Sequence, residues 1–234
     1  MHVTTGLLVL ASAAVLTASG CSSPATAPPA PPELVPANAL DGVLLSAEQV
    51  DAATGTTGMT AHPRVDVMSD HRNLLPNLNC LGIWQVNEAG VYGKDGWIAL
   101  RQELLRSPDT DAWRTLVVQS IVNYRSTDAA REFFTQSADR WSKCTNHNVN
   151  ITLNDQPLPK WRSGELTRTD TTLAIPFTRG EATGVASCQR VLAVDDNVIV
   201  DVQACSRDAG PVTTASAVAD AITAKLPGRT SGQG

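Results

Sequence analysis

The sequence has no excess of positive charge. Its 234 residues contain 18 Lys and Arg against 23 Asp and Glu, which gives a net charge of −5, and aromatic residues make up only 4% of the chain. A protein that binds nucleic acid usually has a basic surface, so this balance argues against nucleic acid as a partner. The composition is typical of a soluble globular protein.

Several catalytic and metal-binding motifs are also missing. The chain has no Gly-x-Ser-x-Gly sequence, no His-Glu-x-x-His sequence and no closely spaced pair of cysteines. These motifs mark α/β-hydrolases, zinc peptidases and structural zinc sites, respectively. His62, His71 and His147 lie in polar segments without the spacing of a catalytic triad, and we expect them to be solvated surface residues. The sequence therefore predicts no enzymatic activity, no metal and no cofactor.

The chain has a single long apolar run, GLLVLASAAVLTASG at residues 6–20, which is too short to cross a membrane as a helix. Its place at the amino end is typical of an export signal. The small residues at 18–20 come directly before Cys21, a pattern that resembles the lipobox of bacterial lipoproteins. We expect residues 1–20 to be a signal peptide and Cys21 to carry diacylglycerol and palmitate. The alternative is an ordinary signal peptide followed by an incidental cysteine.

The rest of the chain divides by composition. Residues 21–40 are crowded with Pro and Ala and have no apolar periodicity, so we expect a tether that stays extended. Residues 41–227 have the length of one globular domain, and residues 228–234 have the composition of a disordered tail. The sequence thus predicts a domain held through Cys21 at the extracytoplasmic face of the cell membrane.

Four cysteines remain besides the lipidated one, namely Cys80, Cys144, Cys188 and Cys205. An even number in an exported chain favours two disulfides, and three pairings are possible. Four cysteines can also hold zinc, although their spacing and the export signal argue against a metal.

The stretch CQRVLAVDDNVIVDVQAC, residues 188–205, indicates which pairing to expect. Asp196 and Asn197 both tolerate the positive φ of a type I′ turn, which would make the stretch a β-hairpin with a two-residue loop. In that register Cys188 faces Cys205 at a non-hydrogen-bonded pair, where the Cα atoms approach to about 4.5 Å and a disulfide fits. Cys80 is then left to pair with Cys144.

Periodicity predicts helices and strands on both sides of this hairpin. A capping box that starts at Ser46 predicts a short helix, and the next elements are two antiparallel strands at 97–105 and 114–124. A helix from about residue 126 to Cys144 follows, with an apolar face of Ala130, Phe133, Phe134, Ser137, Ala138 and Trp141. Further strands and a final helix at 212–226 complete an α+β fold with a mostly antiparallel sheet covered by helices.

The hairpin also carries candidate ligand-binding residues. Arg190, Asp201 and Gln203 lie on its disulfide face, whereas the opposite face is apolar and should pack against a helix. Arg190 and Asp201 are diagonal neighbours in the expected register. They form either a surface ion pair or the wall of a ligand cleft, with Gln119 nearby.

The tryptophans are a second possible binding feature, because aromatic rings stack on sugars. Trp141 lies on the apolar helix face, and we expect it in the core. Trp97, Trp113 and Trp161 lie in loops or at strand ends, and the sequence does not determine whether their side chains are exposed.

Four features together resemble a known family. They are YGKDGW at 92–97, which follows a cysteine, VVQS in a strand at 117–120, WSKC at the end of a helix at 141–144, and a hairpin with a cysteine in each arm. This combination is similar to the PknH-like extracellular sensor domain over roughly residues 40–227. That domain occurs on a mycobacterial serine/threonine kinase and on stand-alone actinobacterial lipoproteins.

The resemblance implies an antiparallel sheet with packed helices, the two disulfides in the pairing above, and a V-shaped cleft for a ligand. The chain lacks a glycine-rich phosphate loop and the HRD and DFG triplets, so it cannot act as a kinase itself. We expect a non-catalytic domain that lies in a cell envelope of the mycobacterial type. It should capture a small molecule or an envelope component for a signalling or transport partner. The alternatives are an envelope interaction protein without a small ligand, and a hydrolase.

Overall fold

The computed structural model describes residues 1–2, 34–153, 156–180, 185–208 and 210–227. The chain divides into one unit at Met1–Pro31 and another at Pro32–Gly234, and only the second is described below. Cys21, nearly all of the expected signal peptide and most of the expected tether lie outside the described residues, as does the expected tail. No described helix has the length and hydropathy needed to cross a membrane.

One antiparallel sheet forms the centre of the domain. In spatial order its strands are β1 (Thr60–Ala61), β2 (Trp97–Ser107), β3 (Thr115–Tyr124), β11 (Val198–Ser206), β10 (Ala186–Asp195), β9 (Thr172–Arg179), β7 (Trp161–Ser163) and β4 (Asn148–Val149), with β8 (Thr167–Arg168) also paired to β9. The short strands β5 (Thr152–Leu153) and β6 (Gln156–Pro157) pair with each other.

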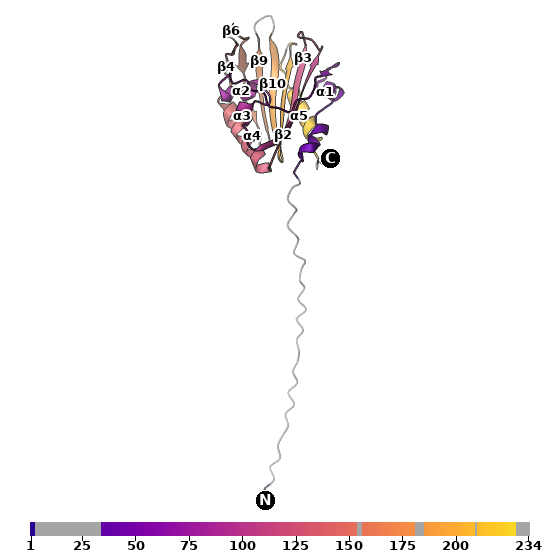
Figure 1. Ribbon diagram of the computed structural model, residues 1–234, viewed down its shortest axis with the longest axis vertical. Helices are drawn as coiled ribbons and strands as arrows, with labels where there is room; N and C mark the ends of the chain where they lie inside the picture. The colour runs from indigo at the N-terminus through magenta and orange to yellow at the C-terminus, as the bar shows by residue number, and fades with distance from the viewer. Residues whose placement is uncertain (3–33, 154–155, 181–184, 209, 228–234) are drawn as a thin grey trace. The chain divides into compact units, whose positions relative to one another are not determined.

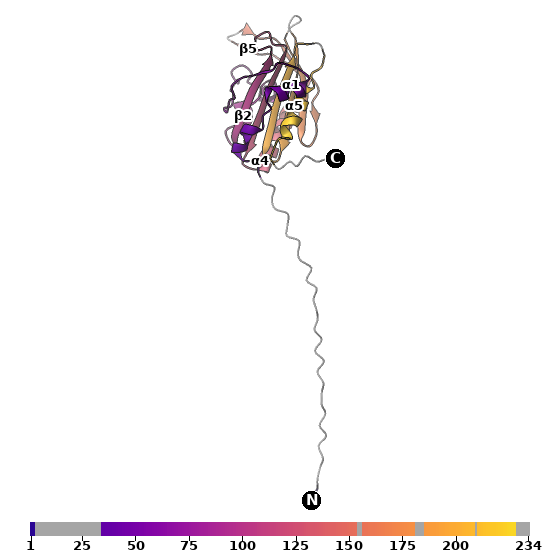
Figure 2. The ribbon, with the colours of Figure 1, turned by 90° about the vertical axis from the view of Figure 1, so that its right-hand side faces the viewer.

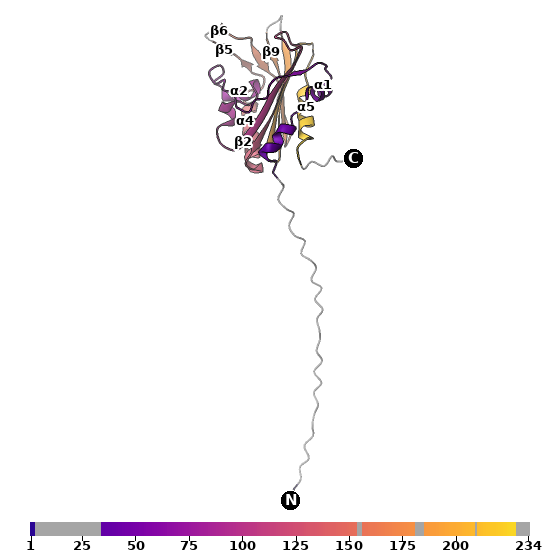
Figure 3. The same ribbon diagram turned by 45° about the vertical axis from the view of Figure 1, so that its right-hand side comes forward.

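Helices cover both faces of this sheet (Figure 1). The face that carries the disulfides, called the disulfide face, packs against α2 (Leu78–Trp84), α3 (Ala89–Tyr92) and α4 (Thr127–Ser142). The other face, called the α5 face, packs against the 3-10 helix η1 (Ala37–Gly42), α1 (Ala47–Thr54) and α5 (Thr214–Thr223). Figure 3 shows β2 between these two helical layers. The predicted α+β fold is confirmed.

The hairpin of β10 and β11 supplies the middle of both cores. Its residues on the α5 face are small and apolar, and they pack against α5, as predicted: Val191, Ala193, Val198, Val200, Val202 and Ala204. Figure 2 shows α1 and α5 lying over the strands on this side. The alternation of side chains along each strand therefore separates the two cores.

The predicted helix signals agree with the structure. Ser46 and Gln49 form the capping box of α1, which ends at Gly55 in the left-handed region with φ of 69°. Ser126 caps α4, and its side chain accepts a hydrogen bond from the backbone N–H of Ala129. All six residues of the predicted apolar face of α4 are buried, including Trp141.

The hairpin has the predicted register but another turn. Asp195 pairs with Val198 and Cys188 pairs with Cys205, with 4.0 Å between the cysteine Cα atoms. Of the two turn residues, only Asp196 has a positive φ, of 46°. The expected type I′ turn needs a positive φ at both residues, so that expectation is wrong. The second disulfide joins Cys80 in α2 to Cys144, just after α4, which is the expected pairing.

The fold begins before the expected boundary at residue 41. Val35 and Leu40, which composition assigns to the tether, are 4% and 0% exposed. The side-chain oxygen of Asn197 accepts a hydrogen bond from the Val35 N–H at 2.9 Å, and the Asn197 amide donates to the Val35 carbonyl at 3.1 Å. The amino end of the domain is therefore fixed at the turn of the β10–β11 hairpin.

Candidate functional site

Two of the candidate ligand residues meet inside the protein. Arg190 and Asp201 form an ion pair on the disulfide face, and their side chains are 1% and 0% exposed. The expected surface ion pair is therefore wrong in its location, because α2 and α4 cover these residues. The backbone carbonyls of Gly82 and Gln85 accept hydrogen bonds from Arg190 at 3.3 and 3.2 Å, so the guanidinium also holds the end of α2.

Asp201 is the centre of a wider buried network. Its carboxylate accepts hydrogen bonds from the Tyr92 hydroxyl at 2.9 Å and from the Asn87 N–H at 3.3 Å. Burial raises the pKa of Tyr92 well above its usual range, and the negative charge of Asp201 raises it further. The side chain of Asn87 donates to Ser120 at 2.5 Å and to Gln102 at 3.0 Å. The network thus joins α3 and the residue Asn87 before it to β2, β3 and β11.

Glu88 extends this network toward the surface. It is fully buried, and its carboxylate contacts the backbone N–H of His71 at 2.9 Å and the ring Nδ1 of His71 at 2.5 Å. His71 is half-buried and also meets the Trp84 ring edge-on, so it is not the free surface residue that we expected. The sequence contains one indication of the pairing between His71 and Glu88, because Glu88 is the only acidic residue in the largely apolar stretch at 81–92.

Little space surrounds the ion pair. The cavity beside Arg190 and Asp201 has a volume of about 10 Å³, which is room for about one water molecule. Gln203 is on the same face and is 5% exposed. In this structure these side chains belong to the interior and not to the wall of an open cleft.

Gln119 lies apart from these residues. It pairs with Val202, whose side chain is on the α5 face, so it is on the other side of the sheet from Arg190 and Asp201. Its amide accepts from the Leu45 N–H at 2.9 Å and donates to Glu103 at 3.0 Å. The expectation that Gln119 is close to the ion pair is wrong.

An open hollow lies elsewhere, beside the start of α5. This first hollow has a volume of about 290 Å³, and its lining combines polar and apolar groups: Asn146, Arg162, Ser163, Gly164, Pro176, Phe177, Thr178, Ser187, Cys188, Pro211 and Val212. A volume of this size is near the lower end for small-molecule pockets.

A row of polar residues crosses the sheet here, and three of its members, Arg162, Thr178 and Ser187, line this hollow. Direct strand pairing links its members, which we call the polar row, in the order Asn148, Arg162, Thr178, Ser187, Ser206 and Thr115. Paired residues in an antiparallel sheet share a face, and Ser187 is next to Cys188, so the row is on the α5 face. It supplies one guanidinium and four hydroxyl groups on a rigid support.

A second hollow continues the row. It has a volume of about 230 Å³, and it contains Thr115 and Ser206 from the polar row together with Thr54, Thr56, Thr213 and Thr214. Pro211 and Val212 line both hollows, so this short segment lies between them. The V-shaped cleft implied by the resemblance stays a prediction.

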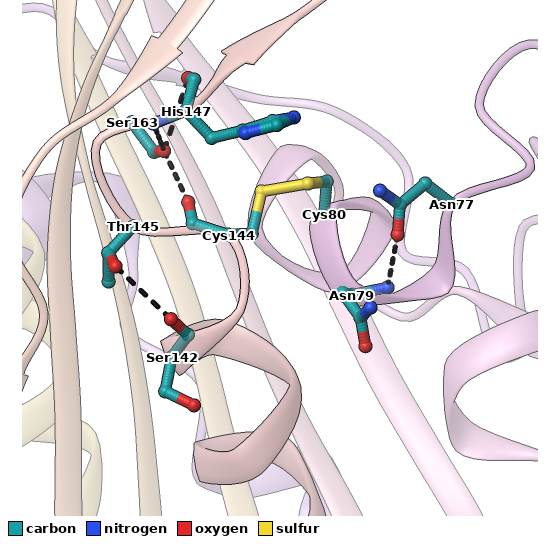
Figure 4. Close-up of a disulfide and its surroundings, with 8 residues drawn as sticks. All are labelled: Asn77, Asn79, Cys80, Ser142, Cys144, Thr145, His147 and Ser163. Atoms are coloured by element: carbon teal, nitrogen blue, oxygen red, sulfur yellow. Dashed lines mark hydrogen bonds between the residues drawn. A yellow bond between two sulfur atoms is a disulfide. The ribbon is translucent and has the colours of Figure 1, made fainter.

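The Cys80–Cys144 disulfide supports one wall of the first hollow. The hydroxyl of Ser163 donates to the carbonyl of Cys144 and accepts from the backbone N–H of His147 at 3.0 Å (Figure 4). Asn146, between them, lines the hollow and donates its backbone N–H to Gly164 at 3.1 Å. The disulfide and Ser163 therefore fix the loop that carries Asn146.

The contacts of Ser163 also bear on whether this serine could act as a nucleophile. Ser163 bonds only backbone atoms of His147, and in Figure 4 the imidazole ring points away from the serine. A serine nucleophile needs contact with the imidazole of a general base. Within the described ranges, no three His, Cys, Asp or Glu side chains gather as a metal site.

The tryptophans are mainly structural. Trp84, Trp141 and Trp161 are 5%, 2% and 2% exposed, and Trp161 stacks on Phe177 with 3.9 Å between ring centroids. Trp113 is 9% exposed beside Arg207, and only Trp97 is half-buried. Of the remaining histidines, His62 contacts Asp109 at 2.9 Å and His147 is exposed.

Comparison with known proteins agrees with this fold. The family model described as PknH-like extracellular domain matches residues 35–225. The serine/threonine-protein kinases PknH of Mycobacterium bovis and Mycobacterium tuberculosis are each 29% identical to this chain over 178 residues, which is 76% of the chain. Those residues cover only 29% and 28% of the two kinases, so the chain spans less than a third of their length.

A solved structure shows the same architecture. The crystal structure of the extracellular domain of PknH from Mycobacterium tuberculosis superposes with a TM-score of 0.74 at 27% identity, over 82% of this chain and 97% of that chain. The similarity therefore concerns the extracellular domain of the kinase and not its catalytic part. With the match over residues 35–225, it shows that this chain belongs to the family of PknH-like extracellular domains.

Proposed function

We propose that this chain is a non-catalytic, sensor-like domain, anchored by lipid on Cys21 at the outer face of the cell membrane. It captures a small molecule or a component of the cell envelope and presents it to a signalling or transport partner. The observation that carries the proposal is the part of the polar row, Arg162, Thr178 and Ser187, that lines the 290 Å³ hollow, in a fold shared with an extracellular kinase domain.

The residues of the first hollow suit binding better than turnover. Arg162, Thr178 and Ser187 come from three adjacent strands, so their donors and acceptors are held at fixed spacing. Pro176, Pro211 and Val212 add apolar contact beside them. Rigid polar groups within a partly apolar hollow are the usual design of a small-molecule site.

The candidate residues from the sequence have a supporting role in this proposal. Arg190, Asp201 and Gln203 are buried on the disulfide face, where the ion pair fixes α2 against the hairpin. Gln119 fixes Leu45 on the α5 face through two hydrogen bonds. These residues therefore hold the two helical layers on the sheet whose strands line the hollows.

The test compares ligand retention in two variants. Thr178 and Thr167 are both exposed strand threonines, but only Thr178 lines the hollow. The full chain, Thr178→Trp and Thr167→Trp are purified from the native envelope and weighed by native mass spectrometry. We expect an added small-molecule mass on the wild type and on Thr167→Trp, and its loss from Thr178→Trp at unchanged thermal stability.

Two other results would count against the proposal. No added mass on any form, combined with co-purification of a stoichiometric protein, supports an envelope interaction protein instead. Turnover of an esterase, peptidase or glycosidase substrate that is lost in Thr178→Trp supports a hydrolase. For the anchor, Cys21→Ser should abolish labelling by a palmitate analogue and release the protein into the medium.

A further inference from the structure

A third hollow lies at the same end of the sheet, near the loop between β2 and β3. It has a volume of about 190 Å³ and is lined by Trp113, Pro159, Arg179, Gly180, Ala186 and Arg207. We call it the arginine hollow. Its lining residues are separate from those of the two hollows beside α5.

The strand register brings Arg179 and Arg207 close together. Arg179 pairs with Ala186 across β9 and β10, and Ser187 pairs with Ser206, so the next residues outward on β10 and β11 are Ala186 and Arg207. One strand, β10, therefore lies between Arg179 and Arg207, and the Cα atoms of the two arginines are about 10 Å apart. Since alanine is small, the space between the two arginine side chains stays open.

Both arginines lie on the disulfide face. Residues two apart along a strand point to the same side, and Arg179, Ala186 and Arg207 are each two residues from a core residue of that face, namely Phe177, Cys188 and Cys205. Trp113 closes one side of the hollow. The guanidinium of Arg207 lies over the Trp113 ring at 4.4 Å from its centroid, which holds Arg207 in place.

Neither guanidinium has an ion-pair partner among the described residues. In the described part of the chain no carboxylate lies within ion-pair distance of Arg179 or Arg207, and Asp208 pairs instead with Arg114 at 2.6 Å. Both residues are exposed as a whole, and the pKa of Arg179 is nevertheless lowered, first by partial desolvation of its guanidinium and second by repulsion from Arg207. An anion between the two groups would relieve this repulsion.

We propose that the arginine hollow binds a phosphate dianion, either as inorganic phosphate or as the phosphate of a monoester. Two guanidinium groups offer two forks of N–H donors, which match the oxygens of phosphate in number and in charge. A carboxylate has one negative charge and two oxygens, so it neutralises only half of the positive charge of the two arginines and offers fewer acceptors. Pro159 and Trp113 leave apolar surface for the rest of a monoester.

The test is calorimetric titration of the full chain in detergent with inorganic phosphate, phenyl phosphate and benzoate at equal ionic strength. We expect either phosphate to bind at least about tenfold more tightly than benzoate, which corresponds to about 1.4 kcal/mol. Tighter binding of phenyl phosphate than of inorganic phosphate identifies a monoester as the ligand class, and equal binding identifies the free ion.

Charge-matched variants locate the site. Arg179→Gln and Arg207→Gln should each weaken phosphate binding about tenfold. Arg168→Gln removes an exposed arginine of β8, outside the hollow, and should leave the affinity within about a factor of two. The proposal is overturned if benzoate binds as tightly as the phosphates, if neither phosphate binds at millimolar concentration, or if all three variants behave alike.

Discussion

The hydroxyl of Tyr92 donates a hydrogen bond to the carboxylate of Asp201 at 2.9 Å, between residues 109 positions apart in the sequence. Tyr92 ends the four-residue helix α3, which is too short to be stable alone. Asp201 is at the centre of β11, the middle of the sheet. This contact fixes α3 to the most rigid part of the domain.

Tyr92→Phe should destabilise the protein by about 2 kcal/mol, because a hydrogen bond to a charged acceptor is lost. Tyr124→Phe is a matched control, since Tyr124 is also buried but its hydroxyl has no partner among the described residues. We expect the control to be neutral in urea unfolding. Equal losses in the two variants would contradict the importance of the contact with Asp201.

The two tyrosines of the chain should not ionise in the folded protein at pH values where free tyrosine does. Burial raises the pKa of both above the usual value of 10.0, and Asp201 adds to the effect. The unfolded chain loses these protons near pH 10, so stability is complete below that pH and falls as the pH rises above it. Tyrosinate absorbance should appear together with the loss of tertiary structure, and ionisation of folded protein near pH 10 would contradict the structure.

Arg190→Met should cost about 3 to 5 kcal/mol, because it leaves the Asp201 carboxylate buried without its cation. Adding Asp201→Asn removes that charge and keeps an acceptor for Tyr92, so the double variant should recover part of the loss. Chemical denaturation measures both. As a control, Arg114→Met removes an exposed pair with Asp208 and should cost less than about 1 kcal/mol.

Asn197→Ala should loosen the amino end of the domain. The variant loses two hydrogen bonds to Val35 and one to the Tyr124 carbonyl, at a cost of about 2 to 3 kcal/mol. We expect faster hydrogen exchange at the Val35 amide. Asp196→Gly, in the same turn, keeps the positive φ and should leave that exchange rate unchanged.

The two disulfides should differ in their contribution to stability. Cys80 and Cys144 are 64 residues apart, and Cys188 and Cys205 are 17 apart. On chain entropy alone, the longer loop contributes about 4 kcal/mol and the shorter about 3 kcal/mol. Replacing Cys80 and Cys144 together by Ser should lower the free energy of unfolding more than the same change at Cys188 and Cys205. The opposite order would show that native-state interactions dominate.

Local patterns in the sequence were sufficient for much of the fold. The valine-rich arms around Asp196 and Asn197 specify the register that brings Cys188 to Cys205. The spacing of apolar residues in α4 predicts its buried face, since a 16-residue helix repeats the pattern several times. These features depend on neighbours within a few residues, and no distant part of the chain alters them.

Tertiary placement was harder to predict. Arg190 and Asp201 alternate with apolar residues as on a solvated strand, but a second helical layer covers that face. The helices α2 and α3 have only seven and four residues, too few to establish a helical period. The side of the sheet on which Gln119 lies follows from the pairing of β3 with β11, which no local pattern reveals.

The hydrogen bonds between Asn197 and Val35 also place the start of the domain far from the polar row. The chain enters at the turn end of β10 and β11, whereas the polar row crosses these strands at Ser187 and Ser206, close to their other end. Eight residues of strand separate the two places, a distance of about 26 Å. Under the proposed function, a molecule bound at the polar row would therefore lie at the end of the hairpin opposite to Val35.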